Sequence, residues 1–150
     1  MWDILLWAAL AAIILTAVIG MFARANNWMK QIRVQQHIGE IRVAGGNWKG
    51  ERPYFTDVSM AELCKDTRND LSPNICGPTK DGKNANPYGG DYIVTVSSNV
   101  SEMDVSLTDV DTSFIDGIAD KLAGSSVDRC IEFAGCGSIS VSGSTIKVTM

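Results

Sequence analysis

Four cysteines are the residues of this 150-residue chain whose type and spacing point most directly to chemistry. Eleven residues separate Cys64 from Cys76, and five separate Cys130 from Cys136. Zinc ligands in structural sites usually come in pairs about two to four residues apart, so neither spacing favours a zinc site. We interpret the four as disulfide-forming, which is the default outside the cytoplasm. Three pairings are possible; local closure of Cys64 with Cys76 and of Cys130 with Cys136 is preferred, because short loops cost the least chain entropy.

The remaining polar residues give weaker evidence of a functional site than the cysteines do. The single histidine, His37, has no acid or nucleophile in a motif relation to it, so we interpret it as a solvated helix residue and not as a catalytic base. Asp104, Asp109 and Asp111 invite a calcium hypothesis, but acids spaced along a strand more often form a solvated face.

Two loop motifs are also weak. Gly77 to Lys83 lacks the spacing of a phosphate-binding loop and follows no strand, which favours a plain surface loop. The glycosylation sequon Asn99-Val100-Ser101 arises easily by chance in a serine-rich region and is interpreted as a turn. We therefore expect no enzyme activity, no cofactor and no metal.

Composition and charge narrow the class of protein. A hydrophobic content of 45% with 20% charged residues excludes a disordered chain. Residues 1–43 carry two acids and four bases, whereas residues 44–150 carry fifteen acids and nine bases. Neither part has the dense basic patch that binds a phosphate backbone, so we expect no direct contact with nucleic acid.

The element that dominates the N-terminus is an uncharged run from Ile4 to Ala23, bounded by Asp3 and Arg24. At about 1.5 Å per residue it spans roughly the 30 Å hydrocarbon core of a bilayer. No basic segment precedes it and no small-residue cleavage site ends it, which favours a retained anchor over a signal peptide.

The helical pattern continues beyond this run. Apolar residues recur three and four positions apart among polar ones, at Trp28, Ile32, Val34, Ile38 and Ile41. The first strong breakers are Ala44-Gly45-Gly46-Asn47, so the sequence predicts one helix over residues 1–43, with Gly20 as the expected place for a bend. Residues 1–23 would be its membrane half and residues 24–43 its amphipathic half, followed by a globular region of residues 44–150.

The spacing of apolar residues in the sequence changes along the globular region. Ser59 to Glu62 fits a capping box that starts a short helix. Residues 73–88 consist of residue types that favour turns. A second helix is predicted from a cap at Thr112 or Ser113 to Ala123. Alternation of period two predicts strands, namely residues 92–96, 103–107, 130–133, 138–141 and 146–150. The expected fold class is α+β, a long N-terminal hydrophobic helix packed on an antiparallel sheet.

This layout resembles that of the type IV pilins over the whole chain. It is most similar to the type IVb branch, which includes the thin conjugative pilins, in its bulky Met1-Trp2 start, its extra helix between late strands, and its ending from Cys130-Ile-Glu-Phe133 to Ile146-Lys-Val-Thr-Met150. It departs from the family in one respect: most members have glutamate at the fifth position, whereas this chain has Leu5 and its acid is Asp3.

The resemblance implies a major pilin that polymerises through its N-terminal helix into an extracellular filament for adhesion or for contact in conjugative DNA transfer. The implied partners are copies of itself, the inner membrane and the assembly machinery before polymerisation, and a recipient-cell or surface receptor. A minor pilin, a secretion-system pseudopilin and a membrane-tethered periplasmic domain are the alternatives. Asp3 would replace the family's glutamate by pairing with the Met1 amine of its own or an adjacent subunit, or would cap the first helical turn. The implied filament-core residues are Met1, Asp3, Leu5, Leu6, Leu10, Ile14, Val18 and Gly20.

Overall fold

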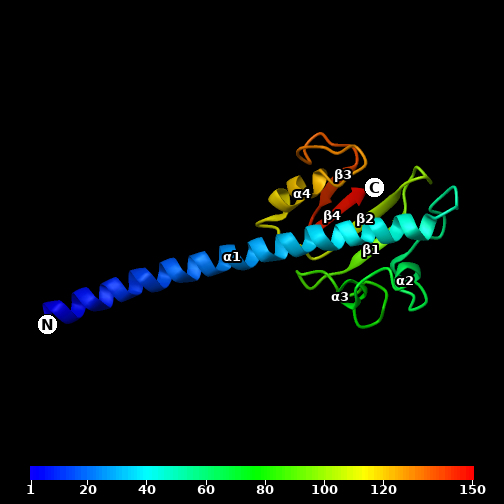
Figure 1. The fold of residues 1–150 in the computed structure, drawn as a ribbon. Helices are drawn as coiled ribbons and strands as arrows, with labels where there is room; N and C mark the ends of the chain where they lie inside the picture. The colour runs from blue at the N-terminus through cyan, green and yellow to red at the C-terminus, as the bar shows by residue number, and fades with distance from the viewer. The chain divides into compact units, whose positions relative to one another are not determined.

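The structure is a computed structural model that describes all 150 residues, Met1–Met150 (Figure 1). Two compact units make up the chain, an N-terminal unit, Met1–Ile32, and a globular unit, Arg33–Met150. The boundary between them falls inside the first helix. A long apolar N-terminal helix followed by a four-stranded antiparallel sheet is the expected α+β layout. The elements in chain order are α1 Trp2–Lys49, α2 Met60–Leu63, α3 Pro73–Cys76, β1 Tyr92–Val96, β2 Met103–Leu107, α4 Ile115–Ala123, β3 Ile139–Ser142 and β4 Thr145–Thr149.

The N-terminal unit consists of the first two-thirds of α1. The helix runs without interruption through Gly20, the residue at which a bend was expected. One glycine costs about 1 kcal/mol relative to alanine inside a helix, which is too little to interrupt a cooperative run of this length. The Thr16 hydroxyl donates a hydrogen bond to the Ile13 carbonyl oxygen of the same helix at 2.8 Å.

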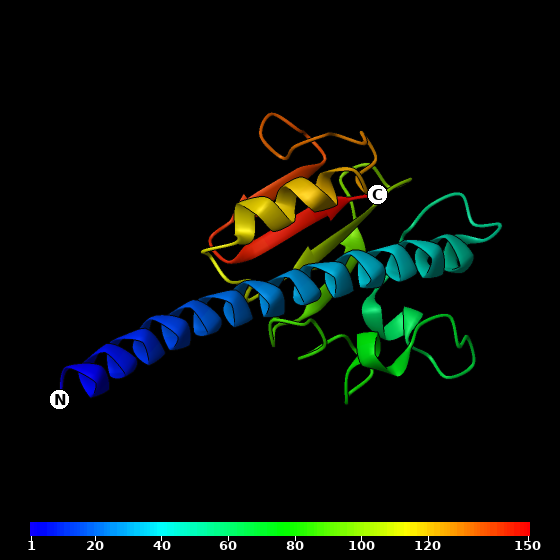
Figure 2. The same cartoon turned by 60° about the vertical axis from the view of Figure 1, so that its left-hand side comes forward.

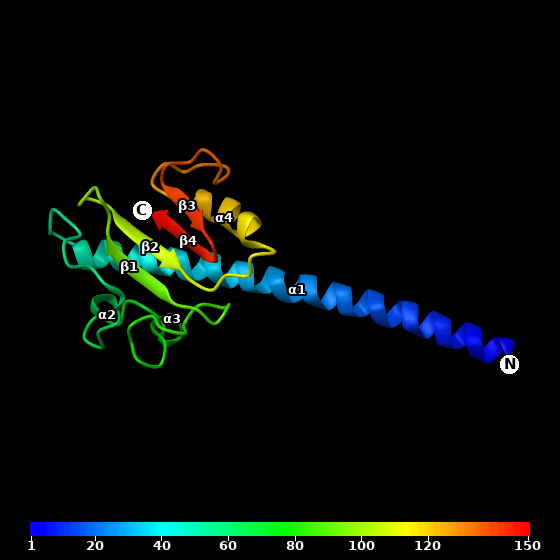
Figure 3. The same cartoon turned by 180° about the vertical axis from the view of Figure 1, so that it is seen from behind.

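The sheet of the globular unit has the strand order β1-β2-β4-β3, with every pair antiparallel. Its register aligns one row of buried side chains, in which Val94 lies opposite Val105 and Val105 opposite Val148. Helix α4 and the Arg33–Lys49 part of α1 lie on the same face of this sheet (Figures 1 and 3). The view turned by 60° shows α4 running along β4 and β3 (Figure 2). The core is therefore one layer between a sheet and two helices.

Helix α1 ends at Lys49 and not at Val43, so the predicted end was wrong. Ala44 and Gly45 are buried in the globular unit, and a Cβ atom on Gly45 would lie 2.5 Å from the Met103 Sδ atom. Packing on the sheet thus outweighs the weak helix propensity of the Gly45-Gly46 pair. The buried stripe of this part of α1 is Val34, Ile38, Ile41, Ala44, Gly45 and Trp48.

Three smaller predictions were also wrong. Residues 130–133 form no strand, and α3 forms where only turns were expected, because Pro73 suits the first turn of a helix. The N-cap of α4 is Phe114, which makes no side-chain cap, whereas Ser113 donates its backbone N–H to the Asp111 carboxylate at 2.9 Å. An aspartate turn therefore leads into α4 in place of a serine or threonine cap.

Trp28 also differs from its predicted role as a member of the buried stripe, since 59% of its surface is exposed. The predicted capping box, by contrast, is present in part. The Ser59 hydroxyl oxygen accepts a hydrogen bond from the Glu62 backbone N–H at 3.2 Å and so begins α2.

Candidate assembly surface

The uncharged stretch of the N-terminal unit is exposed on all sides of its helix. Every residue from Met1 to Asn26 is exposed, and the large apolar side chains among them expose between 53% and 99% of their surface. Four consecutive residues sample a full helical turn, and Ile4, Leu5, Leu6 and Trp7 are all exposed. We call residues Ile4–Ala23 the apolar surface.

Such a surface does not stay in water. Monomeric soluble proteins rarely expose more than a few hundred Å² of contiguous apolar surface, because each Å² in water costs about 25 cal/mol. Helix α1 is long and apolar enough to cross a membrane, and its most apolar stretch is unburied within the chain. The helix therefore indicates a membrane-anchored or secreted protein.

The residues named from the pilin resemblance lie on this unit. Leu5, Leu6, Leu10, Ile14 and Val18 are all exposed apolar side chains on the helix, and Gly20 has open space around its Cα. A helix that is apolar all round has to be buried in lipid or protein. Their contact with other subunits stays a prediction.

Asp3 is not the N-cap that one interpretation required. The helix begins at Trp2, so Asp3 lies inside its first turn, where the helix dipole still favours a carboxylate. The Asp3 side chain makes no hydrogen bond or ion pair with the Met1 amine or with any other group of its own chain. Arg24, at the opposite end of the apolar surface, has no such partner either.

All four cysteines are in disulfides. Cys64 pairs with Cys76 and Cys130 with Cys136, with Cα–Cα distances of 5.6 Å and 6.1 Å, which is the local pairing preferred above. The Asp128 carboxylate lies within 4.8 Å of the second pair of sulfurs. Bonded sulfurs offer no thiolate to a metal ion, so this cluster is not a metal site. Two disulfides indicate an oxidising periplasmic or extracellular location.

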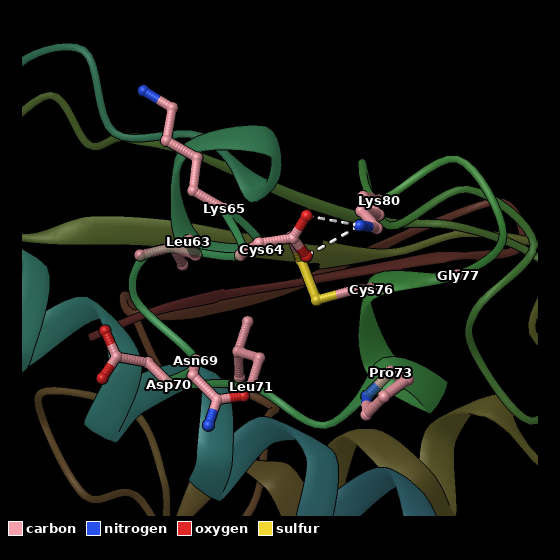
Figure 4. Close-up of a pocket in the computed structure, with 11 residues that line it drawn as sticks. Leu63, Cys64, Lys65, Asn69, Asp70, Leu71, Pro73, Cys76, Gly77 and Lys80 are labelled. Atoms are coloured by element: carbon pink, nitrogen blue, oxygen red, sulfur yellow. Dashed lines mark hydrogen bonds and ion pairs between the residues drawn. A yellow bond between two sulfur atoms is a disulfide. The ribbon is translucent and has the colours of Figure 1, made fainter.

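A cavity of about 120 Å³ lies beside the Cys64–Cys76 disulfide (Figure 4). The Lys80 ammonium and the Asp66 carboxylate form an ion pair at 2.7 Å on its wall. Asp70, another lining residue, is paired with Arg68 at 3.0 Å. Both acids on this wall are therefore ion-paired, and both sulfurs are bonded to each other.

His37 is half-buried and not the solvated residue that the sequence suggested. Its Nδ1 atom lies 2.8 Å from the hydroxyl oxygen of Tyr92, and the two rings meet edge to face at 5.7 Å. Burial lowers the pKa of His37, Glu40 opposes that shift and Arg33 adds to it. Tyr92 lies 55 residues away in the chain, so no local sequence pattern predicted this contact.

The three acidic residues of the calcium hypothesis have separate local roles. Asp104 accepts a hydrogen bond from the Thr149 hydroxyl at 2.7 Å and lies 3.4 Å from the Lys147 ammonium. Asp109 has a positive φ of 55°, and Asp111 forms the turn before α4. They do not gather into a cation site.

The glycosylation sequon forms the turn between β1 and β2. The Asn99 amide donates to the Glu102 carboxylate at 2.8 Å, and its oxygen accepts from the Ser101 backbone N–H at 3.2 Å. Both bonds lie within four residues of chain, which agrees with the prediction of a turn.

Comparison with known proteins finds no matching family model, no similar curated protein and no similar solved structure.

Proposed function

We propose that this chain is the major structural subunit of a type IVb pilus, a filament that extends from the bacterial surface for adhesion or for contact in conjugative DNA transfer. The observation that carries the proposal is the apolar surface, which no part of its own chain covers. Before assembly that surface is buried in the inner membrane, with the globular unit in the periplasm. After assembly it is buried among the same helices of other copies.

The chemistry of the chain supports this proposal. A helix apolar on every side has two suitable environments, lipid and a bundle of similar helices, and assembly exchanges the first for the second. Repeating one such contact with a fixed rotation and rise produces an open helical filament and not a closed ring. The globular unit, with two disulfides and the acidic part of the sequence, is suited to the outer surface of the filament.

The test is to shear filaments from the cell surface and to identify their main component by mass spectrometry. We expect this chain to be the most abundant protein, and deletion of its gene to remove the filaments. If the chain is a trace component, it is a minor pilin; a pseudopilin is present in the membrane and absent from surface filaments. Recovery in the inner membrane alone, with filaments intact after deletion, would identify a membrane-tethered periplasmic domain.

A further inference from the structure

Opposite charges stand at the two ends of the apolar surface. Asp3 precedes it and Arg24 follows it, and no charged side chain lies between them. Asp3 is also the only acidic residue of the N-terminal unit. Both side chains are exposed and make no ion pair or hydrogen bond within the chain.

Burial of the apolar surface in a bundle of helices forces both charges to find partners. An unpaired ion in a dry environment is strongly unfavourable. Arginine does not lose its charge in proteins, so Arg24 has to meet an anion or stay in water. Among bundled N-terminal units the available anion is Asp3 of another copy.

The orientation of the copies decides how the two charges meet. Chains anchored in one membrane, all with the globular unit on the same side, enter a bundle parallel to one another. Without an axial offset, parallel copies place Asp3 beside Asp3 and Arg24 beside Arg24, which is repulsive. Displacement by the sequence distance between them, 24 − 3 = 21 residues, places opposite charges side by side.

We propose that neighbouring copies in the filament pack in parallel with an axial offset of about 31 Å, and that Asp3 of one copy binds Arg24 of the next; this rests on the proposed function. The offset is 21 residues at about 1.5 Å each. A guanidinium and a carboxylate form two parallel hydrogen bonds, which gives the contact directional specificity as well as charge neutralisation.

The same offset separates the assembled state from the membrane state. Hydrophobic matching holds copies in a bilayer at equal depth, where both charges remain at the headgroup level and like charges face each other. The pairing offset is about the thickness of the hydrocarbon core, roughly 30 Å. A copy therefore reaches its partner only as it leaves the membrane, which disfavours lateral clusters and favours the growing filament.

Charge reversal in cells that carry the assembly machinery tests the pair. Asp3→Arg and Arg24→Asp should each lower the yield of sheared filaments by at least about tenfold, because each buries like charges together, while the subunit level in the membrane stays unchanged. The double variant Asp3→Arg/Arg24→Asp should restore filaments. Glu51→Arg, an exposed charge reversal in the globular unit, is the matched control and should assemble normally.

Coexpression makes the test intermolecular. One single variant carries two positive charges and the other two negative charges, so copies that alternate satisfy every contact and mixed filaments should form. Normal filaments from both single variants would overturn the pair, and so would two deficient variants that neither the double variant nor coexpression rescues. Those results leave the proposed function standing, whereas absence of the unmodified chain from filaments refutes the function itself.

Discussion

His37 shows how a residue without a motif acquires a defined environment. It lies on α1, and its ring nitrogen meets the hydroxyl of Tyr92, the first residue of β1. Burial raises the pKa of Tyr92 far above its ordinary value, so the phenol stays protonated, and it shares one hydrogen bond with the His37 Nδ1 atom. Glu40 and Arg33, the charged neighbours on α1, act on His37 in opposite directions. Burial is the largest of these effects, and the pKa of His37 lies below its ordinary value.

We expect the globular unit to lose stability as the pH falls below about 6.5, the ordinary pKa of His37. The pKa of His37 is lowered in the folded state, so the unfolded chain takes up the proton first, and stability that is present above that value declines with the pH. Melting curves recorded from about pH 7.5 to about pH 5, a range that brackets the ordinary histidine pKa, should show this decline. His37→Gln, which keeps a hydrogen-bonding side chain, should weaken the dependence; an unchanged slope would contradict the assignment.

At the level of elements, the end of α1 depends on how closely it packs on β2. Gly45 faces the buried Met103 side chain, whereas the neighbouring Gly46 is exposed and has open space around its Cα. The two glycines have the same local sequence context and opposite surroundings. Substitutions at these two positions therefore distinguish the effect of helix propensity from that of tertiary packing.

Gly46→Ala should stabilise the protein by about 0.5–1 kcal/mol, because alanine is the better helix former and meets nothing. Gly45→Val should destabilise it by about 1–3 kcal/mol, because the added atoms compress Met103 in a filled core. Denaturant unfolding of the detergent-solubilised chain measures both. Equal effects of the two substitutions would show that α1 does not pack on β2 in this way.

For the whole molecule, solubility and folding depend on different units: the N-terminal unit limits solubility, and the globular unit contains the folded core. The first buried residue in the chain is Val34, so residues 1–28 contribute no side chain to the core. Their apolar surface makes the full chain dependent on lipid, detergent or other copies. The globular unit has its own core and both disulfides.

Deletion of Met1 to Trp28 should therefore give a soluble, folded monomer with a cooperative thermal transition. Light scattering and circular dichroism in buffer without detergent measure this directly. The full-length chain in the same buffer is the control and should aggregate. Aggregation of the truncated chain, or a melt without a transition, would mean that residues 1–28 are needed for folding.

Sequence alone was sufficient where a signal is local. The uncharged run of Ile4–Ala23, the period-two strands β1, β2 and β4, and the Ser59 cap depend on residues within a few positions of one another. Cysteine spacing likewise favoured the local disulfides, since short loops close at the least entropy cost. These features follow from side-chain periodicity and loop length, and both can be read directly from the sequence.

Only the tertiary structure decided features that join distant residues. The end of α1 at Lys49 depends on Gly45 meeting Met103, and the state of His37 depends on Tyr92. Residues 130–133 alternate like a strand, yet the Phe133 backbone N–H donates to the Asp120 carboxylate of α4 at 3.0 Å instead of joining a ladder. In each case the free energy of a contact between remote segments outweighs a local preference of about 1 kcal/mol, and no window of sequence contains both partners.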